Sequence, residues 1–205
     1  MSTPMPALIL ASTSPYRREL LGRLGLPFET VAPQVDETPI AGETPAAAAR
    51  RLARAKAEAV AAALPAARAD ALVIGSDQTA TLDGRRIIGK PGGHEQARAQ
   101  LRAASGREMV FHTALALLRR SDGLVDEQLV QTRVRFRELS DTAIEAYLTA
   151  ERPYDCAGSA KAEGLGIALL ASLDGPDPTA LIGLPLIALT GALCRAGLPP
   201  IGGLR

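Results

Sequence analysis

The chain has 205 residues, and its content of 47% hydrophobic and 22% charged residues is typical of a globular protein and excludes a disordered one. The 23 basic and 22 acidic residues give a net charge of +1, which argues against a nucleic-acid polymer as partner. No run of about 18 uncharged apolar residues is present, and the first residues lack the basic region of a signal peptide. The sequence therefore predicts no membrane partner and a cytoplasmic location.

The first half of the chain alternates short apolar runs with helix signals. Ser14 followed by Pro15 is typical of a capped helix start, and Thr44 followed by Pro45 marks a second one. In chain order we expect a strand at residues 7–11, a helix at 15–24, a strand at 28–32, a polar loop at 33–43, an alanine-rich helix at 45–64 and a buried strand at 71–75.

The second half adds hairpin turns to the strands and helices. Asp-Gly pairs at 83–84 and 122–123 are turn signals, and Ser140 is typical of a helix cap. The expected elements are a return strand that ends at residues 89–93, a helix at 95–104, a strand at 109–118, an alternating strand at 130–137, a helix at 140–149, an irregular segment at 152–166, a strand at 167–170, a closing helix at 186–196 and a fraying tail at 197–205.

This order of elements predicts an α/β fold, because strand–helix units coexist with hairpins. We expect a single domain over residues 1–205, with a mixed central sheet, helices on both sides and a cleft between two lobes. The alternating strand places Arg133, Arg135 and Arg137 on one face, which we expect to be solvent-exposed, with an interface as the alternative. His112 is expected to be an ordinary strand histidine and not a catalytic base.

Lysine is rare in this chain. Of the 23 basic residues only Lys56, Lys90 and Lys161 are lysines, and a compact ammonium differs from the planar arginine fork in size and hydration. Lys56 lies within the apolar stripe of its helix, four residues from both Leu52 and Val60. Its ammonium must either snorkel to solvent or meet an anion, and the sequence leaves both possibilities open.

Two polar segments of the first half are candidate binding sites. Residues 12–18 combine a helix start with Ser12 and Arg17, which suits a phosphate; the alternative is an ordinary capped helix with surface arginines. The adjacent carboxylates of Asp36 and Glu37 suit Mg²⁺ or Mn²⁺; the alternative is a pair of solvated loop charges.

Two further candidates follow in the chain. Asp77 is expected just beyond an apolar strand, a position suited to a metal ligand or general base, with a plain turn aspartate as the alternative. Lys90 stands between Gly89 and Pro91, where it suits a phosphate, with a surface turn lysine as the alternative. Taken together, the four segments indicate chemistry on phosphoryl or diphosphate groups, where positioning and charge neutralisation supply most of the rate.

The cysteines do not indicate a metal site of another kind. Cys156 and Cys194 stand in no CxxC or zinc-type spacing, and the chain has only two histidines. We expect both thiols to be packing residues. Any metal would have to be a hard divalent cation held by carboxylates and phosphates.

Seven segments of the chain resemble, in order and spacing, the Maf family of nucleoside triphosphate pyrophosphatases. They are ASTSPYRRELL, VDETP, LARAKAEAV, VIGSDQ, IGKP, CAGSAKAEGLGI and IGLPL, and the resemblance covers residues 8–193. It implies hydrolysis between the α- and β-phosphates of a nucleotide, which gives a monophosphate and diphosphate. It also implies a divalent cation, Mg²⁺ or Mn²⁺, a two-lobed Maf/ITPase-like fold and a homodimer.

Three positions resemble the branch of this family that acts on 7-methyl-GTP and removes such modified nucleotides. Tyr16 stands where the dTTP/UTP branch has arginine, although the 7-methyl-GTP branch more often has tryptophan there. Gln78 stands in a Ser-Asp-Gln segment where the other branch has Ala-Asp-Thr, and Glu163 stands where it has glutamine. The chemistry agrees, because 7-methylguanine carries a positive charge that an aromatic face and a carboxylate attract.

The resemblance also implies roles for the candidate residues. Asp77 would be the proton acceptor that activates water, and Glu37 and Asp77 would hold the cation. The triphosphate would be bound by Ser12, Arg17, Lys56 and Lys90. No role is implied for Lys161. The alternatives are a dTTP/UTP pyrophosphatase of the same family and a nucleotide-binding regulator of septum formation and cell division.

Overall fold

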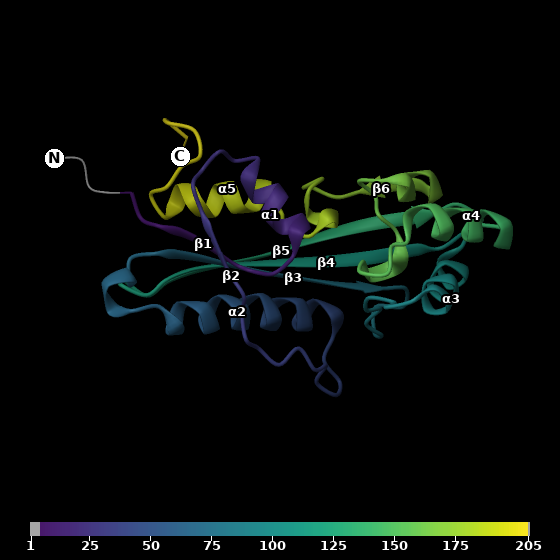
Figure 1. The fold of residues 1–205 in the computed structure, drawn as a ribbon, viewed down its shortest axis with the longest axis horizontal. Helices are drawn as coiled ribbons and strands as arrows, with labels where there is room; N and C mark the ends of the chain where they lie inside the picture. Colours follow the sequence, from purple (N-terminus) through teal and green to yellow (C-terminus); the bar gives the residue numbers. More distant parts are fainter. Residues whose placement is uncertain (1–4, 205) are drawn as a thin grey trace.

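The computed structural model describes residues 5–204, so the first four residues of the N-terminal segment and the last residue of the predicted tail lie outside it. The described residues form one six-stranded sheet with the order β2-β1-β3-β4-β5-β6 (Figure 1). The strands are β1 (Leu8–Ala11), β2 (Glu29–Val31), β3 (Leu72–Thr81), β4 (Glu108–Arg119), β5 (Leu124–Phe136) and β6 (Leu170–Asp174). β1 pairs in parallel with β2 and β3, and the other neighbours are antiparallel, which confirms the predicted mixed sheet.

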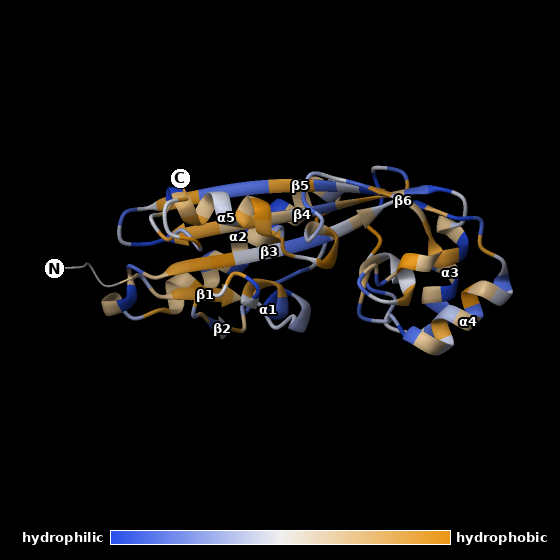
Figure 2. Ribbon diagram, turned by 90° about the horizontal axis from the view of Figure 1, so that it is seen from above, coloured by the Kyte–Doolittle hydropathy of each residue, from blue (hydrophilic) through white to orange (hydrophobic). Residues whose placement is uncertain are grey.

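Helices cover both faces of this sheet, as predicted. Within residues 5–204 the α-helices are α1 (Pro15–Gly22), α2 (Pro45–Ala63), α3 (His94–Ala104), α4 (Asp141–Glu151) and α5 (Leu186–Arg195). α2 lies on one face, and α1 and α5 lie on the other (Figure 1). α3 and α4 lie together at the end of the molecule that is away from α1, α2 and α5 (Figure 2).

The apolar alternation of the first strands builds one core on each face. Leu8 and Leu10 of β1 pack on the side of α1 and α5, together with Ile74 of β3. Ile9 and Val73 point the other way and pack against α2. A third core joins the far ends of β4 and β5 to α3 and α4. The two predicted lobes therefore share long strands that pass from one to the other.

The prediction that the third strand stops at Gly75 is wrong, because β3 continues to Thr81. Its polar second half is stabilised by antiparallel pairing with β4, and Ser76 Oγ donates to the Ala114 carbonyl at 2.8 Å. Asp77 consequently lies in the middle of a paired strand. This position is more rigid than the strand end that the sequence predicted.

Two shorter strands also differ from prediction. The expected return strand of the 83–84 hairpin is reduced to a single bridge between Ala80 and Ile88. The expected strand at residues 167–170 is mostly a 3₁₀ turn, Leu165–Leu169, and β6 begins only at Leu170. Both differences arise where pairing depends on distant residues and not on local apolar patterns.

The predicted tail is anchored at its start. Gly197 has a φ of +81°, and the Leu198 amide donates to the Leu193 carbonyl at 2.8 Å, which ends α5 as a Schellman motif. The Leu198 side chain lies in the core, whereas residues 201–204 are exposed.

The alternation predicted for this strand is confirmed, because Arg133, Arg135 and Arg137 are exposed in the single chain and the residues between them are buried. That this face is solvent and not an interface stays a prediction. His112 lies half-buried in β4, where burial lowers the pKa of its imidazole. No helix within residues 5–204 combines the length and apolar character needed to cross a membrane.

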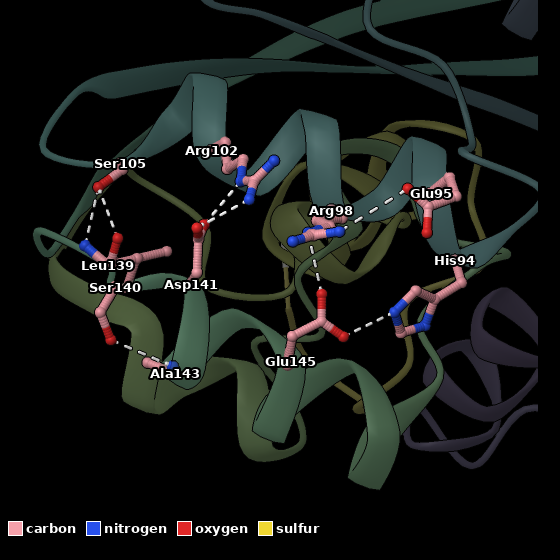
Figure 3. Close-up of polar contacts among 10 residues, drawn as sticks. All are labelled: His94, Glu95, Arg98, Arg102, Ser105, Leu139, Ser140, Asp141, Ala143 and Glu145. Atoms are coloured by element: carbon pink, nitrogen blue, oxygen red, sulfur yellow. Dashed lines mark hydrogen bonds and ion pairs between the residues drawn. The ribbon is translucent and has the colours of Figure 1, made fainter.

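α3 and α4 are joined by polar contacts along their facing sides (Figure 3). Arg102 Nε lies 2.6 Å from Asp141 Oδ1, and Arg98 Nε lies 3.0 Å from Glu145 Oε1. His94 places its Nε2 2.9 Å from the other oxygen of Glu145. The contacts fix the start of α3, which follows the loop that carries Lys90.

Gly75 allows α2 to approach β3 closely. A Cβ at this position would overlap the carbonyl oxygen of Ala53 and lie 2.8 Å from the Ala57 nitrogen. Both atoms belong to the backbone of α2, so they cannot move aside unless the helix shifts. This contact sets the separation between Lys56 on α2 and Asp77 on β3.

We predict that Gly75→Ala lowers the free energy of unfolding by about 2–3 kcal/mol, the cost of overpacking a rigid contact. Urea denaturation measures this change. The matched control is Gly22→Ala in α1, where a Cβ would meet nothing within 4 Å. The control should be unchanged or up to about 1 kcal/mol more stable. A Gly75→Ala protein as stable as the control would contradict the close packing of α2 on β3.

Candidate functional site

One pocket of about 570 Å³ lies between the two lobes. Its walls come from α1 and α2 of the first lobe, and from β4 and the segment after α4 in the second. Nine of the site residues predicted from the sequence line it: Ser12, Tyr16, Arg17, Glu37, Lys56, Asp77, Gln78, Lys90 and Glu163. Asp36, the other carboxylate of the predicted pair, does not line it, and its Oδ1 accepts from the Thr38 amide at 2.9 Å. The structure thus brings together residues that are up to 151 positions apart, and the predicted cleft is present.

The start of α1 forms one wall of the pocket. Ser14 caps the helix by accepting from the Arg17 amide at 3.4 Å, and Ser12 Oγ accepts from the Ser14 amide at 3.1 Å. The Arg17 guanidinium is fixed by its Nε, which donates to the Gly183 carbonyl at 2.8 Å. Burial lowers the pKa of Arg17, while the charges of Asp77 and Glu37 act in the opposite direction.

The ammonium of Lys56 contacts two carboxylates. Its side chain is 6% exposed, and Nζ lies 2.6 Å from Asp77 Oδ1 and 2.8 Å from Glu37 Oε1. The sequence left open whether Lys56 snorkels or meets an anion, and the structure shows the anion. The Asp77 side chain is itself only 10% exposed, so the ammonium supplies the charge that its burial requires.

Glu37 is held in its ionised form. Burial alone would raise the pKa of Glu37, but the hydrogen bond and charge of Lys56, with the charges of Lys90 and Arg17, bring it below its ordinary value. Three cations thus act on the same carboxylate. We name Arg17, Glu37, Lys56, Asp77 and Lys90 the basic zone of the pocket.

Tyr16 belongs to a different set of contacts. Its hydroxyl donates to Asp155 Oδ2 at 2.9 Å, and the Lys161 ammonium lies 5.7 Å from the centre of its ring. Burial and the bond to Asp155 raise the pKa of Tyr16, so the phenol keeps its proton. We name Tyr16, Asp155, Cys156 and Glu163, which all line the pocket, the aromatic zone. Because Tyr16 and Arg17 are successive residues, the first turn of α1 reaches both zones.

Gln78 is oriented by its amide nitrogen. Nε2 donates to the carbonyls of Ala180 and Leu181 and to Thr113 Oγ1, each at 2.9 Å. Only the amide nitrogen can donate, so the Oε1 atom remains as the acceptor that this side chain offers to a ligand.

The pocket holds residues that the sequence did not single out for it. Asp155 lies 139 positions from Tyr16, and no local pattern pointed to it. Arg51 lines the pocket and pairs with Glu43 through two contacts, at 2.7 and 2.8 Å. Cys156 also lines it; burial and the neighbouring Asp155 raise the pKa of this thiol to about 12, so it stays protonated.

The carboxylates suit a hard cation that is completed by a substrate. Among residues 5–204, no three histidine, cysteine, aspartate or glutamate side chains gather closely enough to hold a metal. Glu37 and Asp77 each place one oxygen within 2.8 Å of Lys56 Nζ, so the two carboxylates lie close together beside the ammonium. Mg²⁺ commonly takes one or two carboxylates and fills its remaining positions with water and substrate phosphates. The donor set therefore fits such an ion.

Comparison with known proteins agrees with this pocket. The family model described as Maf-like protein matches residues 7–196. The chain belongs to the Maf family. A Maf relative from Paraburkholderia xenovorans, named 7-methyl-GTP pyrophosphatase, is 61% identical over 197 residues, which cover 96% of this chain and 95% of the relative. Another of the same name, from Cupriavidus metallidurans, is 59% identical over 201 residues and 98% of each chain. The resemblance inferred from the motifs is confirmed.

A solved structure is also similar to this Maf chain. The Staphylococcus aureus Ham1 protein matches with a TM-score of 0.44 and 18% identity, over 66% of this chain and 72% of that one.

We predict that Lys56→Met lowers the free energy of unfolding by about 3 kcal/mol, because Asp77 would lose its counter-charge. Urea denaturation at neutral pH without divalent cations measures the loss. Lys90→Met is the matched control, since Lys90 lines the same pocket but is exposed, and it should change stability by less than about 0.5 kcal/mol. Equal losses in the two variants would contradict the account of a buried Lys56–Asp77 pair.

Proposed function

We propose that this Maf protein hydrolyses 7-methyl-GTP to 7-methyl-GMP and diphosphate. The observation that carries the proposal is a single pocket that joins the basic zone to the aromatic zone. A nucleotide with a cationic base has the matching distribution of charge, with polyphosphate at one end and positive charge at the other. The names of the near-full-length relatives support the same substrate.

The basic zone is proposed to bind the triphosphate. Arg17 presents a fixed guanidinium, and Lys90 is exposed at the rim of the pocket. With Lys56 and Ser12, these side chains would offset the charge that develops on the leaving diphosphate. Phosphoryl transfer needs little more from a protein than such positioning and charge neutralisation.

Asp77 is proposed as the proton acceptor. Its place in the middle of β3 fixes the carboxylate, and the Lys56 ammonium lies 2.6 Å from its Oδ1. As the oxygen of a water molecule bonds to the α-phosphorus, one proton of that water passes to Asp77 and the other stays on the new oxygen of the monophosphate. The bond between the α-phosphorus and the bridging oxygen breaks, and that oxygen leaves with the electron pair as part of diphosphate.

Glu37 and Asp77 are proposed to hold a divalent cation, Mg²⁺ or Mn²⁺. Bound there, the ion would neutralise charge on the phosphates and polarise them.

The aromatic zone is proposed to read the base. The Tyr16 ring attracts the positive charge of 7-methylguanine, and the Glu163 carboxylate attracts it further. Gln78 Oε1 can accept from the N–H groups of the guanine edge, because its amide nitrogen is already engaged. A homodimer and a cytoplasmic location rest on the sequence alone and stay predictions.

The test is diphosphate release by the purified protein with Mg²⁺ or Mn²⁺, compared across 7-methyl-GTP, GTP, dTTP, UTP and CTP. We expect 7-methyl-GTP to give the highest kcat/KM. Asp77→Asn should lower kcat by about 100-fold or more, since it removes the proton acceptor. Preference for dTTP or UTP would overturn the role given to Tyr16 and Glu163. Binding without turnover of any nucleotide would instead favour the alternative, a nucleotide-binding regulator of septum formation and cell division.

A further inference from the structure

Asp155 is a carboxylate of the pocket to which the proposed function gives no role. It belongs to the segment between α4 and β6, the same segment that carries Glu163, and both carboxylates line the pocket. Its Oδ2 accepts from the Tyr16 hydroxyl at 2.9 Å, and its Oδ1 accepts from the Cys156 thiol at 3.5 Å. Burial alone would raise the pKa of Asp155, but the bond from Tyr16 and the charge of Lys161 lower it. The group is therefore a fixed anion.

Lys161 pairs with this carboxylate. Its Nζ lies 3.9 Å from Asp155 Oδ1 and 3.9 Å from Glu151 Oε1. The same ammonium lies over the Tyr16 ring, at 5.7 Å from the ring centre. One lysine thus contacts two carboxylates, so the three groups together carry one net negative charge.

The backbone around this cluster is tightly fitted. A Cβ on Gly166 would lie 2.5 Å from the Lys161 nitrogen, and the Lys161 amide donates to the Tyr147 hydroxyl at 3.0 Å. On the other side, the Tyr154 hydroxyl lies 3.0 Å from His94 Nδ1 at the start of α3. The segment that bears Asp155 is thus anchored at both ends of the cluster, and the carboxylate keeps its position.

From these contacts we infer that Asp155 is a specificity-determining residue, which selects a cationic base by adding a second negative charge beside Tyr16 and Glu163. The inference rests on the proposed function and extends it. A neutral guanine gains little from this charge, whereas a 7-methylguanine ring that stacks near Tyr16 is attracted to both carboxylates. Selectivity between the two nucleotides is therefore expected to depend on Asp155, while binding of the triphosphate is not.

The experiment compares kcat/KM for 7-methyl-GTP and GTP in the wild type and in Asp155→Asn, which keeps the size of the side chain. The ratio of the two constants should fall about fivefold in Asp155→Asn, with the GTP constant changed less than about twofold. The fall should shrink as the salt concentration rises from about 0.05 M to about 0.5 M, because an exposed charge is screened. Asp174→Asn, an exposed carboxylate outside the pocket, is the matched control and should leave the ratio unchanged.

Two further variants separate charge from structure. Tyr16→Phe removes only the hydroxyl that orients Asp155 and should lower the ratio by about twofold. Lys161→Gln removes the opposing charge and should raise the ratio, again by about twofold. If Asp155 only supported the fold, its loss would lower both constants equally, and that result would overturn the inference. A fall in the ratio of the two kcat/KM values in Lys161→Gln would also overturn the inference.

The outcomes also distinguish this inference from the proposed function. A wild type that prefers 7-methyl-GTP, with an unchanged ratio in Asp155→Asn, overturns only the role of Asp155. A wild type that does not prefer 7-methyl-GTP overturns the proposed function, and the inference falls with it.

Discussion

The ammonium of Lys56 lies 2.6 Å from Asp77 and 2.8 Å from Glu37, and this contact joins α2, β3 and the loop before α2 at one point. A carboxylate as buried as Asp77 would be costly without a counter-charge, so the lysine is a condition for placing an acidic group inside a paired strand. The short distance depends in turn on Gly75, whose lack of a side chain lets α2 lie directly on the strand. The packing of one glycine and the chemistry of the pocket are thus parts of the same arrangement.

The side chains that line the pocket form two groups of different charge. The basic zone carries three cations that all act on Glu37, whereas the aromatic zone carries Tyr16 and two carboxylates on one segment of chain. α1 connects them, because Tyr16 bonds to Asp155 and the next residue, Arg17, bonds to Gly183. A nucleotide that contacts both zones therefore has one favoured direction, with its phosphates at the cations of the basic zone. This asymmetry is the physical basis of the proposed selectivity for a positively charged base.

Local sequence predicted those features that depend on neighbouring residues. The cap and proline at the start of α2 are confirmed. The position of Lys56 in an apolar stripe left a choice between snorkelling and an anion partner, and the structure shows the anion. Features that depend on distant residues were not predicted from the sequence. The continuation of β3 past Gly75 depends on pairing with β4, and the contact of Asp155 with Tyr16 joins residues 139 positions apart. The family motifs supplied the remaining site residues, because their common pocket is not visible in spacing alone.

The two groups of charge are proposed to fix the direction in which the nucleotide lies across the pocket. A crystal structure of Asp77→Asn with 7-methyl-GTP and Mg²⁺ would show this direction, because the variant is expected to bind substrate without turning it over. We expect the base against Tyr16, within reach of Asp155, and the phosphates among Arg17, Lys56 and Lys90. A nucleotide bound in the opposite direction, or outside the pocket, would contradict it.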